Sequence, residues 1–209
     1  MPTKDPEGIS RILTTRRIEA LADGIFAFAM TLLVTILGIT GTTSGASSGK
    51  TPITNLLLGQ WRMFYHYALS FTLLAVFWIY HHRQYHDIER TDGIHIWINI
   101  FILMFVAMMP FSTDLVVDYS DEPIVECFFG ANLMVLGLLF LANLIYASKR
   151  GLMKHGLPPY VYTINVRRLA VIPAVSLVAM ATAFITPNWG LSVYIAIPII
   201  ISLPWFRRW

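Results

Sequence analysis

The sequence has few charged residues and a single cysteine, and these two shortages exclude most classes of soluble protein. Of its 209 residues, 13% are charged, whereas soluble domains carry about 25%. A chain with so little charge cannot cover a water-facing surface in the usual way. The lone Cys127 excludes a disulfide scaffold. Apolar residues make up 56% of the chain, with a mean hydropathy of +0.62, and indicate an integral membrane protein.

Long runs without charge divide the chain into membrane spans. A helix needs about 20 apolar residues to cross a hydrocarbon core about 30 Å thick. The run from Leu169 to Phe206 is too long for one span and is interrupted by the turn residues at 186–190. We therefore predict one all-α transmembrane domain over residues 1–209. Its six helices are predicted near residues 17–40, 56–82, 93–113, 124–148, 166–186 and 190–207.

The basic residues fix the predicted orientation. Of the 15 lysines and arginines, only Lys50 and Arg62 fall on the side of the membrane away from the two chain ends. Basic loops stay in the cytoplasm, so we predict that both termini are cytoplasmic. The basic pI of about 9.1 then reflects topology. The expected partner is the lipid bilayer, and no nucleic acid is expected.

Asp23 is the clearest ionisable residue inside a predicted span. It follows Arg16 and Arg17 closely and precedes a long apolar run. An ionisable side chain within a span is costly and usually functional. Two interpretations stay open: the carboxylate is buried against neighbouring helices, or it lies among the lipid headgroups and pairs with Arg16.

A helical wheel of the first span gathers bulky apolar side chains and two hydroxyls on one stripe. Asp23 points away from this stripe. The alternative to a functional role for the hydroxyls is that each threonine donates to its own backbone carbonyl one turn earlier. The stripe consists of Gly24, Phe28, Thr31, Leu32, Thr35 and Ile39.

Polar residues of the second and third spans lie at a depth similar to that of Asp23. His81 and His82 end the second span, and Asn99 lies in the cytoplasmic half of the third. A buried Asn or His needs a hydrogen-bond partner in lipid, and a carboxylate is a good acceptor. We therefore predict a polar cluster that joins the first three helices. The third helix is expected to end in the segment 110–113.

The patterns for catalysis or metal binding are weak. His82 and His86 have the i, i+4 spacing of metal ligands, but no third ligand is evident. Cys127 has no activating base nearby in the sequence, and no serine has a nucleophile-elbow pattern. We therefore expect no enzyme, no cofactor and no metal other than a permeating ion.

Three stretches resemble the transmembrane protein 175 family of potassium channels, in its prokaryotic six-helix branch. The first is RIEALADGIFAFAMTLLV, which begins at Arg17. The second is WIYHHR, which begins at Trp78, and the third is WIN from Trp97 followed by MPFST from Met109. The family has an Arg six residues before the Asp of a Phe-Ser-Asp triplet. Here the triplet reads Leu-Ala-Asp and ends at Asp23.

The resemblance implies a potassium-permeable channel of the plasma membrane, a homotetramer whose pore is lined by the first helix and lacks a re-entrant filter. It implies an apolar constriction at Phe28, with Leu32 and Thr35 also lining the pore. It places a modest potassium preference at Thr31. A structural polar network is implied for Arg17, Asp23, His81, His82, Trp97 and Asn99.

One alternative function stays open, a proton- or ion-coupled secondary transporter that uses Asp23 as its coupling carboxylate. Such a transporter is expected to have broken helices and inverted repeats, and the sequence gives little support for them. A non-conducting scaffold or enzyme subunit would leave the threonine stripe unexplained.

Overall fold

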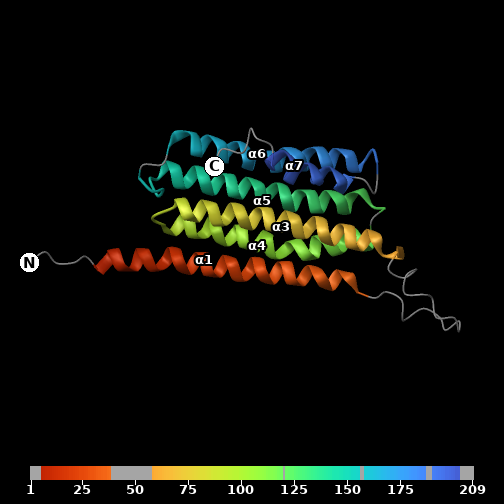
Figure 1. Cartoon of the computed structure of the whole chain (residues 1–209), viewed down its shortest axis with the longest axis horizontal. Coiled ribbons are helices and arrows are strands. Elements are labelled where there is room, and N and C mark those ends of the chain that lie inside the picture. Colours follow the sequence, from red (N-terminus) through yellow and green to blue (C-terminus); the bar gives the residue numbers. More distant parts are fainter. Residues whose placement is uncertain (1–5, 39–57, 120, 156–157, 187–189, 203–209) are drawn as a thin grey trace, which may run out of the picture.

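A computed structural model of the chain describes residues 6–38, 58–119, 121–155, 158–186 and 190–202. Long helices run side by side and form one bundle (Figure 1). The elements are α1 (Pro6–Leu32), the 3₁₀ helix η1 (Leu33–Leu37), α3 (Trp61–Asp87), α4 (Gly93–Asp118), α5 (Pro123–Lys149), α6 (Pro159–Ala183), the 3₁₀ helix η2 (Gly190–Ile195) and α7 (Ala196–Ser202).

Five helical segments in the described part of the chain are long and apolar enough to cross a membrane. The prediction of an all-α membrane protein is therefore confirmed. A sixth apolar segment, Gly190–Ile201, is shorter than a full span. The predicted sixth helix continued to residue 207, and residues 203–209 lie outside the described residues. The five long segments are Arg16–Leu37, Trp61–Asp87, Gly93–Asp118, Pro123–Lys149 and Tyr160–Ala183.

The first helix differs from the predicted single helix over 17–40. Its α-helical part ends at Leu32, and the chain continues as the 3₁₀ helix η1 to Leu37. A tighter last turn satisfies carbonyls that an α-helix end leaves unpaired. Ile39, the last member of the predicted stripe, lies outside the described residues, as do residues 39–57 before α3.

The predicted end of the third helix at 110–113 is wrong, because α4 continues through Pro110 to Asp118. Proline removes a backbone donor, and nearby hydroxyls often re-satisfy the freed groups in membrane helices. The helix tolerates the missing donor and continues for about two more turns, in which the hydroxyls of Ser112 and Thr113 donate to the carbonyl of Met109 at 2.9 and 2.8 Å. Sequence hydropathy therefore placed this helix end about one turn too early.

Two other predicted helix ends are also wrong, because packing and proline chemistry extend the helices. α3 continues to Asp87 rather than ending at 82, and its last turns bury Gln84 and Tyr85. α6 begins at Pro159 rather than at 166. Proline is favoured at the first helical position because its missing N–H is not needed there.

The connections α3–α4 and α5–α6 meet at one end of the bundle, which we call the basic end. The backbone N–H groups of Glu89 and Arg90 donate to the carbonyl of Leu152, and the N–H of Lys154 donates to the carbonyl of Asp87. The N-terminal part of α1 projects from the same end (Figure 1). The basic end carries Arg83, Arg90, Lys149, Arg150 and Lys154.

α1 lies at the edge of the bundle, against α3 and α4, on the side opposite α6 and α7 (Figure 1). Its inward face is closely packed: Ala22, Phe26, Ala29 and Leu33 are at most 1% exposed. These residues recur every three or four positions, as one face of a helix requires. Among the described residues, no other element therefore covers the opposite face of α1.

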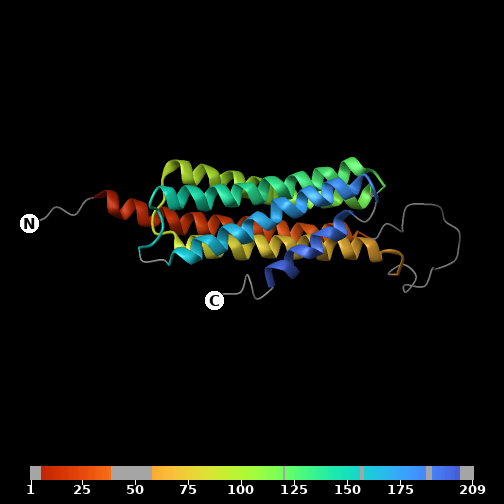
Figure 2. The same cartoon turned by 90° about the horizontal axis from the view of Figure 1, so that it is seen from above.

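α6 crosses α5 obliquely in the turned view (Figure 2), and glycines of α5 allow the two helices to approach closely. A Cβ atom added at Gly137 would lie 2.9 Å from Cδ of Pro173. One added at Gly130 would lie 2.6 Å from Cγ of Met180. Small residues at such contacts are typical of membrane helix packing.

Candidate pore face and polar network

The outward face of α1 contains the residues of the predicted stripe. Phe28 is 65% exposed, although it is a large apolar side chain. Thr31 and Thr35 are exposed beside it, and Leu32 is half-buried. Gly24 adds an open position one turn earlier, where a Cβ atom would meet no neighbour within 4 Å. The described stripe is therefore a continuous surface on one copy of the chain, which we call the pore face.

Both threonines of the pore face donate their hydroxyl protons to the helix backbone. Thr31 Oγ1 lies 2.8 Å from the carbonyl oxygen of Ala27, and Thr35 Oγ1 lies 2.6 Å from that of Leu32. A hydroxyl oxygen that donates its proton still has lone pairs to offer. The backbone bond thus fixes the hydroxyl without removing its ability to accept a hydrogen bond or bind a cation.

Asp23 lies beside the pore face and is hydrogen-bonded to α3. Its Oδ1 accepts a hydrogen bond from the indole Nε1 of Trp78 at 2.9 Å. The Trp78 ring in turn stacks on His82, with ring centroids 5.8 Å apart and an interplanar angle of 21°. A groove of about 470 Å³ borders this contact between α1 and α3. It is lined by Asp23, Phe26, Ala27, Met30, Ala75 and Trp78.

His81 and Asn99 form a buried hydrogen bond between α3 and α4. Nε2 of His81 lies 2.8 Å from Oδ1 of Asn99, and both residues are at most 2% exposed. Because the amide oxygen only accepts, Nε2 carries the proton in this arrangement. The ring of Phe26 packs on His81 with centroids 5.9 Å apart. The contact therefore joins α3 and α4 directly beneath the inward face of α1.

The six residues predicted as one network do not form one cluster. Asp23 bonds to Trp78 rather than to His81 or Asn99. Trp97 is 61% exposed and packs on Phe101. It lies two positions from Asn99, and such residues point to different sides of a helix. His82 is exposed on α3, in contact with Trp78.

Arg17 is also separate from the predicted network. It is exposed on α1, and within the described part of the chain no ion pair joins it to Asp23. Six residues along an α-helix correspond to a rotation of about 240°, so the two side chains leave the helix on different sides. The alternative pairing of Asp23 with Arg16 is likewise not found among the described ion pairs.

Sequence reasoning missed a buried polar chain between α3 and α5. Gln84 Nε2 donates to the carbonyl of Phe140 at 3.0 Å, and Asn143 Nδ2 donates to Oε1 of Gln84 at 3.1 Å. The signal was present, because Gln and Asn inside apolar spans commonly hydrogen-bond between helices. Tyr85 was missed as well, and it stacks on His81 with centroids 4.4 Å apart.

Asp92 organises the basic end from the N-cap of α4. Its Oδ1 accepts from the backbone N–H of His95 at 2.9 Å, and its Oδ2 accepts from the Tyr146 hydroxyl at 2.8 Å. Burial alone raises the pKa of Asp92, but these bonds and the nearby Arg150 charge outweigh it and lower the pKa below its usual value. The carboxylate thus links α4 to α5 in its ionised form.

Within the described residues, no group of three His, Cys, Asp or Glu side chains lies close enough together to hold a metal ion. His86 instead lies with its Nδ1 3.3 Å from Oδ1 of Asp87. Cys127 is 9% exposed at the start of α5. Its Sγ lies 3.8 Å from the carbonyl of Met180.

Comparisons with known proteins match the N-terminal half of the bundle most directly. A family model described as "Endosomal/lysosomal potassium channel TMEM175" matches residues 17–110. A potassium channel of Chamaesiphon minutus is 35% identical over 109 residues, which are 52% of each chain. A potassium channel of Streptomyces collinus is 30% identical over 106 residues, 51% of this chain and 49% of that relative. The chain thus spans about half the length of the curated relatives it matches.

The fold comparison extends over nearly the whole chain. The crystal structure of a lysosomal potassium-selective channel TMEM175 homolog from Chamaesiphon minutus superposes with a TM-score of 0.78 at 25% sequence identity. The superposition covers 91% of this chain and 97% of that one. Together with the apolar helices, these matches identify a multi-pass membrane protein. The chain is similar to the TMEM175 family in the sequence of its N-terminal half and in its fold.

Proposed function

We propose that the protein is a potassium-permeable cation channel of the plasma membrane, with both termini in the cytoplasm. The observation that carries the proposal is the pore face of α1, which is exposed on one copy and combines a large apolar side chain with hydroxyls. The relatives named potassium channels support the same function.

The proposal includes assembly of four copies around an axis. A single stripe on an edge helix cannot enclose a path for ions, whereas several copies related by a closed rotation can. α1 lies at the edge of the bundle (Figure 1), so its pore face can meet the same face of other copies while the remaining helices stay outside.

Within such an assembly, Phe28 forms the apolar constriction, and Leu32 and Thr35 line the path in the following turns. Apolar constrictions close pores by excluding water. Thr31 is one turn from Phe28, and the lone pairs of its oxygen replace part of the hydration shell of a potassium ion. Because hydroxyls on a helix are less rigid than a ring of backbone carbonyls, the potassium preference is modest.

Asp23 and Trp78 have a structural role in this proposal. Their hydrogen bond ties the pore helix to α3 immediately before the pore face begins. His81 and Asn99 then hold α3 to α4 at the same level. These contacts fix the rotation of α1, and with it the direction in which Phe28 and Thr31 point.

Passive ion flux tests the proposal. Purified protein is reconstituted in liposomes, and cation flux is measured under a potassium gradient alone and then under a sodium gradient alone. A channel conducts without a second coupling ion and conducts potassium faster than sodium. Flux that requires an opposing proton or sodium gradient would instead favour the transporter alternative and make Asp23 its coupling group.

A further inference from the structure

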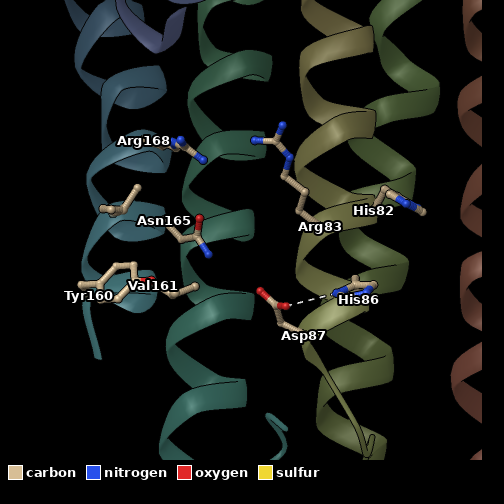
Figure 3. A pocket seen from close by; sticks show the side chains of 9 residues that line it. His82, Arg83, His86, Asp87, Tyr160, Val161, Asn165 and Arg168 are labelled. Carbon is tan, nitrogen blue, oxygen red and sulfur yellow. Dashed lines mark hydrogen bonds and ion pairs between the residues drawn. The ribbon is translucent and has the colours of Figure 1, made fainter. Parts of the chain in front are cut away.

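A cavity of about 570 Å³ lies between α3 and α6 at the basic end (Figure 3). Its volume is within the range of about 300–1,000 Å³ that is usual for small-molecule sites. It is separate from the groove beside Asp23. Neither the pore face nor the hydrogen bonds Trp78–Asp23 and His81–Asn99 involve this space.

Two arginines from different helices point into the cavity. Arg83 of α3 and Arg168 of α6 extend toward each other across the gap (Figure 3). Arg168 is only 9% exposed, and Arg83 is half-buried. Arginine stays charged at all physiological pH values. Two guanidinium groups that face each other from different helices can donate to the oxygens of one oxyanion from both sides.

The other lining residues add donors and little negative charge. Asp87 is the single acidic side chain among the described lining residues, and its Oδ1 lies 3.3 Å from Nδ1 of His86. Asn165 of α6 points into the gap between the arginines and Asp87 (Figure 3). With its amide N–H groups it can donate to an oxyanion.

The position of the cavity matches the membrane surface. Arg83 lies four residues before the end of α3, about 6 Å along the helix axis. Tyr160, in the first turn of α6, is 57% exposed and lines the same cavity. Aromatic residues with a polar tip are enriched at the level of lipid headgroups. Basic pockets between membrane helices at this level bind phosphate-bearing headgroups.

We propose that the α3–α6 cavity binds a phosphate group, held by the guanidinium groups of Arg83 and Arg168 and by the amide of Asn165. Guanidinium groups bind phosphate oxygens through paired hydrogen bonds and are preferred at such sites. The phosphate has two chemical sources, the headgroup of an anionic phospholipid or a soluble phosphate ion.

The two sources are distinguished with the full chain purified in a neutral detergent. Thermal unfolding is followed with short-chain phosphatidylglycerol, with short-chain phosphatidylcholine and with inorganic phosphate. A ligand that binds only the folded chain raises the melting temperature. We expect phosphatidylglycerol or inorganic phosphate to raise it and phosphatidylcholine to leave it unchanged. A rise in melting temperature with phosphatidylglycerol but not with inorganic phosphate identifies a lipid site. A rise with inorganic phosphate identifies a site for a soluble anion.

Arg83→Gln tests the site, and Arg167→Gln is its matched control, because Arg167 is an exposed neighbour of Arg168 that does not line the cavity. We expect R83Q to weaken binding of the active probe by about tenfold, from the loss of one charged hydrogen-bonding group, and R167Q to retain it. Asn165→Asp is a second variant that places a negative charge in the cavity if R83Q does not fold, and it is expected to weaken binding as well.

Three results would overturn the proposal. The first is the absence of any shift with either phosphate probe. The second is an equal shift with phosphatidylcholine, which would indicate binding of the acyl chains alone. The third is binding by R83Q or N165D that is as strong as binding by R167Q. None of these readouts depends on ion conduction, so the proposal fails or stands independently of the proposed channel function.

Discussion

The indole Nε1 of Trp78 donates a hydrogen bond to Oδ1 of Asp23 across 2.9 Å, and this bond joins the edge helix α1 to α3. Trp78 also stacks on His82, one turn further along α3. The carboxylate at the start of the membrane span is therefore held by a side-chain donor rather than by an arginine. Its partner fixes how α1 is rotated relative to the rest of the bundle.

Trp78→Phe is predicted to loosen α1 without removing an aromatic ring. The substitution deletes the donor to Asp23, and we expect the free energy of unfolding to fall by about 1 kcal/mol. The matched control is Trp97→Phe, because Trp97 is 61% exposed and packs only loosely on Phe101. Thermal unfolding and size-exclusion chromatography of both variants check this, and equal behaviour of the two would contradict it.

Thr31→Ala is predicted to lower the preference for potassium over sodium while conduction persists. The substitution removes a hydroxyl oxygen from the pore face but leaves Phe28 in place. Thr72→Ala is the control, since Thr72 on α3 is also exposed and also donates to the carbonyl four residues earlier, at 2.7 Å. The measurement is the ratio of potassium to sodium flux in liposomes. An unchanged ratio in T31A would remove Thr31 from the selectivity assignment.

Gly137→Ala is predicted to destabilise the contact between α5 and α6. The new Cβ would lie 2.9 Å from Cδ of Pro173 and 3.0 Å from Ile172. Such overpacking costs about 1–3 kcal/mol, more than the gain in helix propensity of about 1 kcal/mol. Gly93→Ala is the control, because a Cβ there meets nothing within 4 Å. A melting temperature of G137A at or above that of G93A would be inconsistent with this packing.

We predict that the free energy of unfolding falls in acid because Asp92 becomes protonated. The pKa of Asp92 in the folded chain is below the ordinary value of 3.8. The full contribution of the ionised carboxylate to the free energy of unfolding is therefore present above that pH. The contribution is lost as the pH falls below 3.8 toward the folded value. Asp92→Asn keeps an N-cap acceptor for α4 but cannot titrate.

The check for Asp92 is the melting temperature between pH 6 and pH 3. We expect the wild-type chain to lose more stability below about pH 4 than D92N does. Asp121→Asn is the control, because Asp121 is exposed at the other end of the bundle. If the profiles of wild type and D92N run parallel, the ionised Asp92 does not link α4 to α5.

The sequence was sufficient for the class of protein and for the approximate position of the long spans. Charge-free runs are a direct consequence of the hydrocarbon core, so their lengths predict helices well. Helix ends were less predictable, because they depend on local partners. α4 continues past Pro110 with Ser112, Thr113 and Val116 buried, and burial of Gln84 and Tyr85 accompanies the longer α3.

The sequence indicated which polar residues lie at the same depth in the bundle, but it did not indicate which of them bond to each other. Depth along the helices placed His81 and Asn99 at one level, and they do form a hydrogen bond. Depth says nothing about rotation, so it did not distinguish Asn99, which faces inward, from Trp97, which faces outward. The choice of Trp78 as the partner of Asp23 depends on how α1 is rotated against α3, which only packing decides.

The central claim is that the pore face of α1 lines the ion path, and thiol labelling of Phe28→Cys tests it most directly. Potassium flux into liposomes is measured before and after a cationic thiol reagent. The wild-type chain controls for Cys127, and Val178→Cys controls for an exposed site on α6, where Val178 is 54% exposed. We predict that the reagent blocks flux through F28C and leaves the wild-type chain and V178C unaffected. Unchanged flux through F28C after complete labelling would contradict the account.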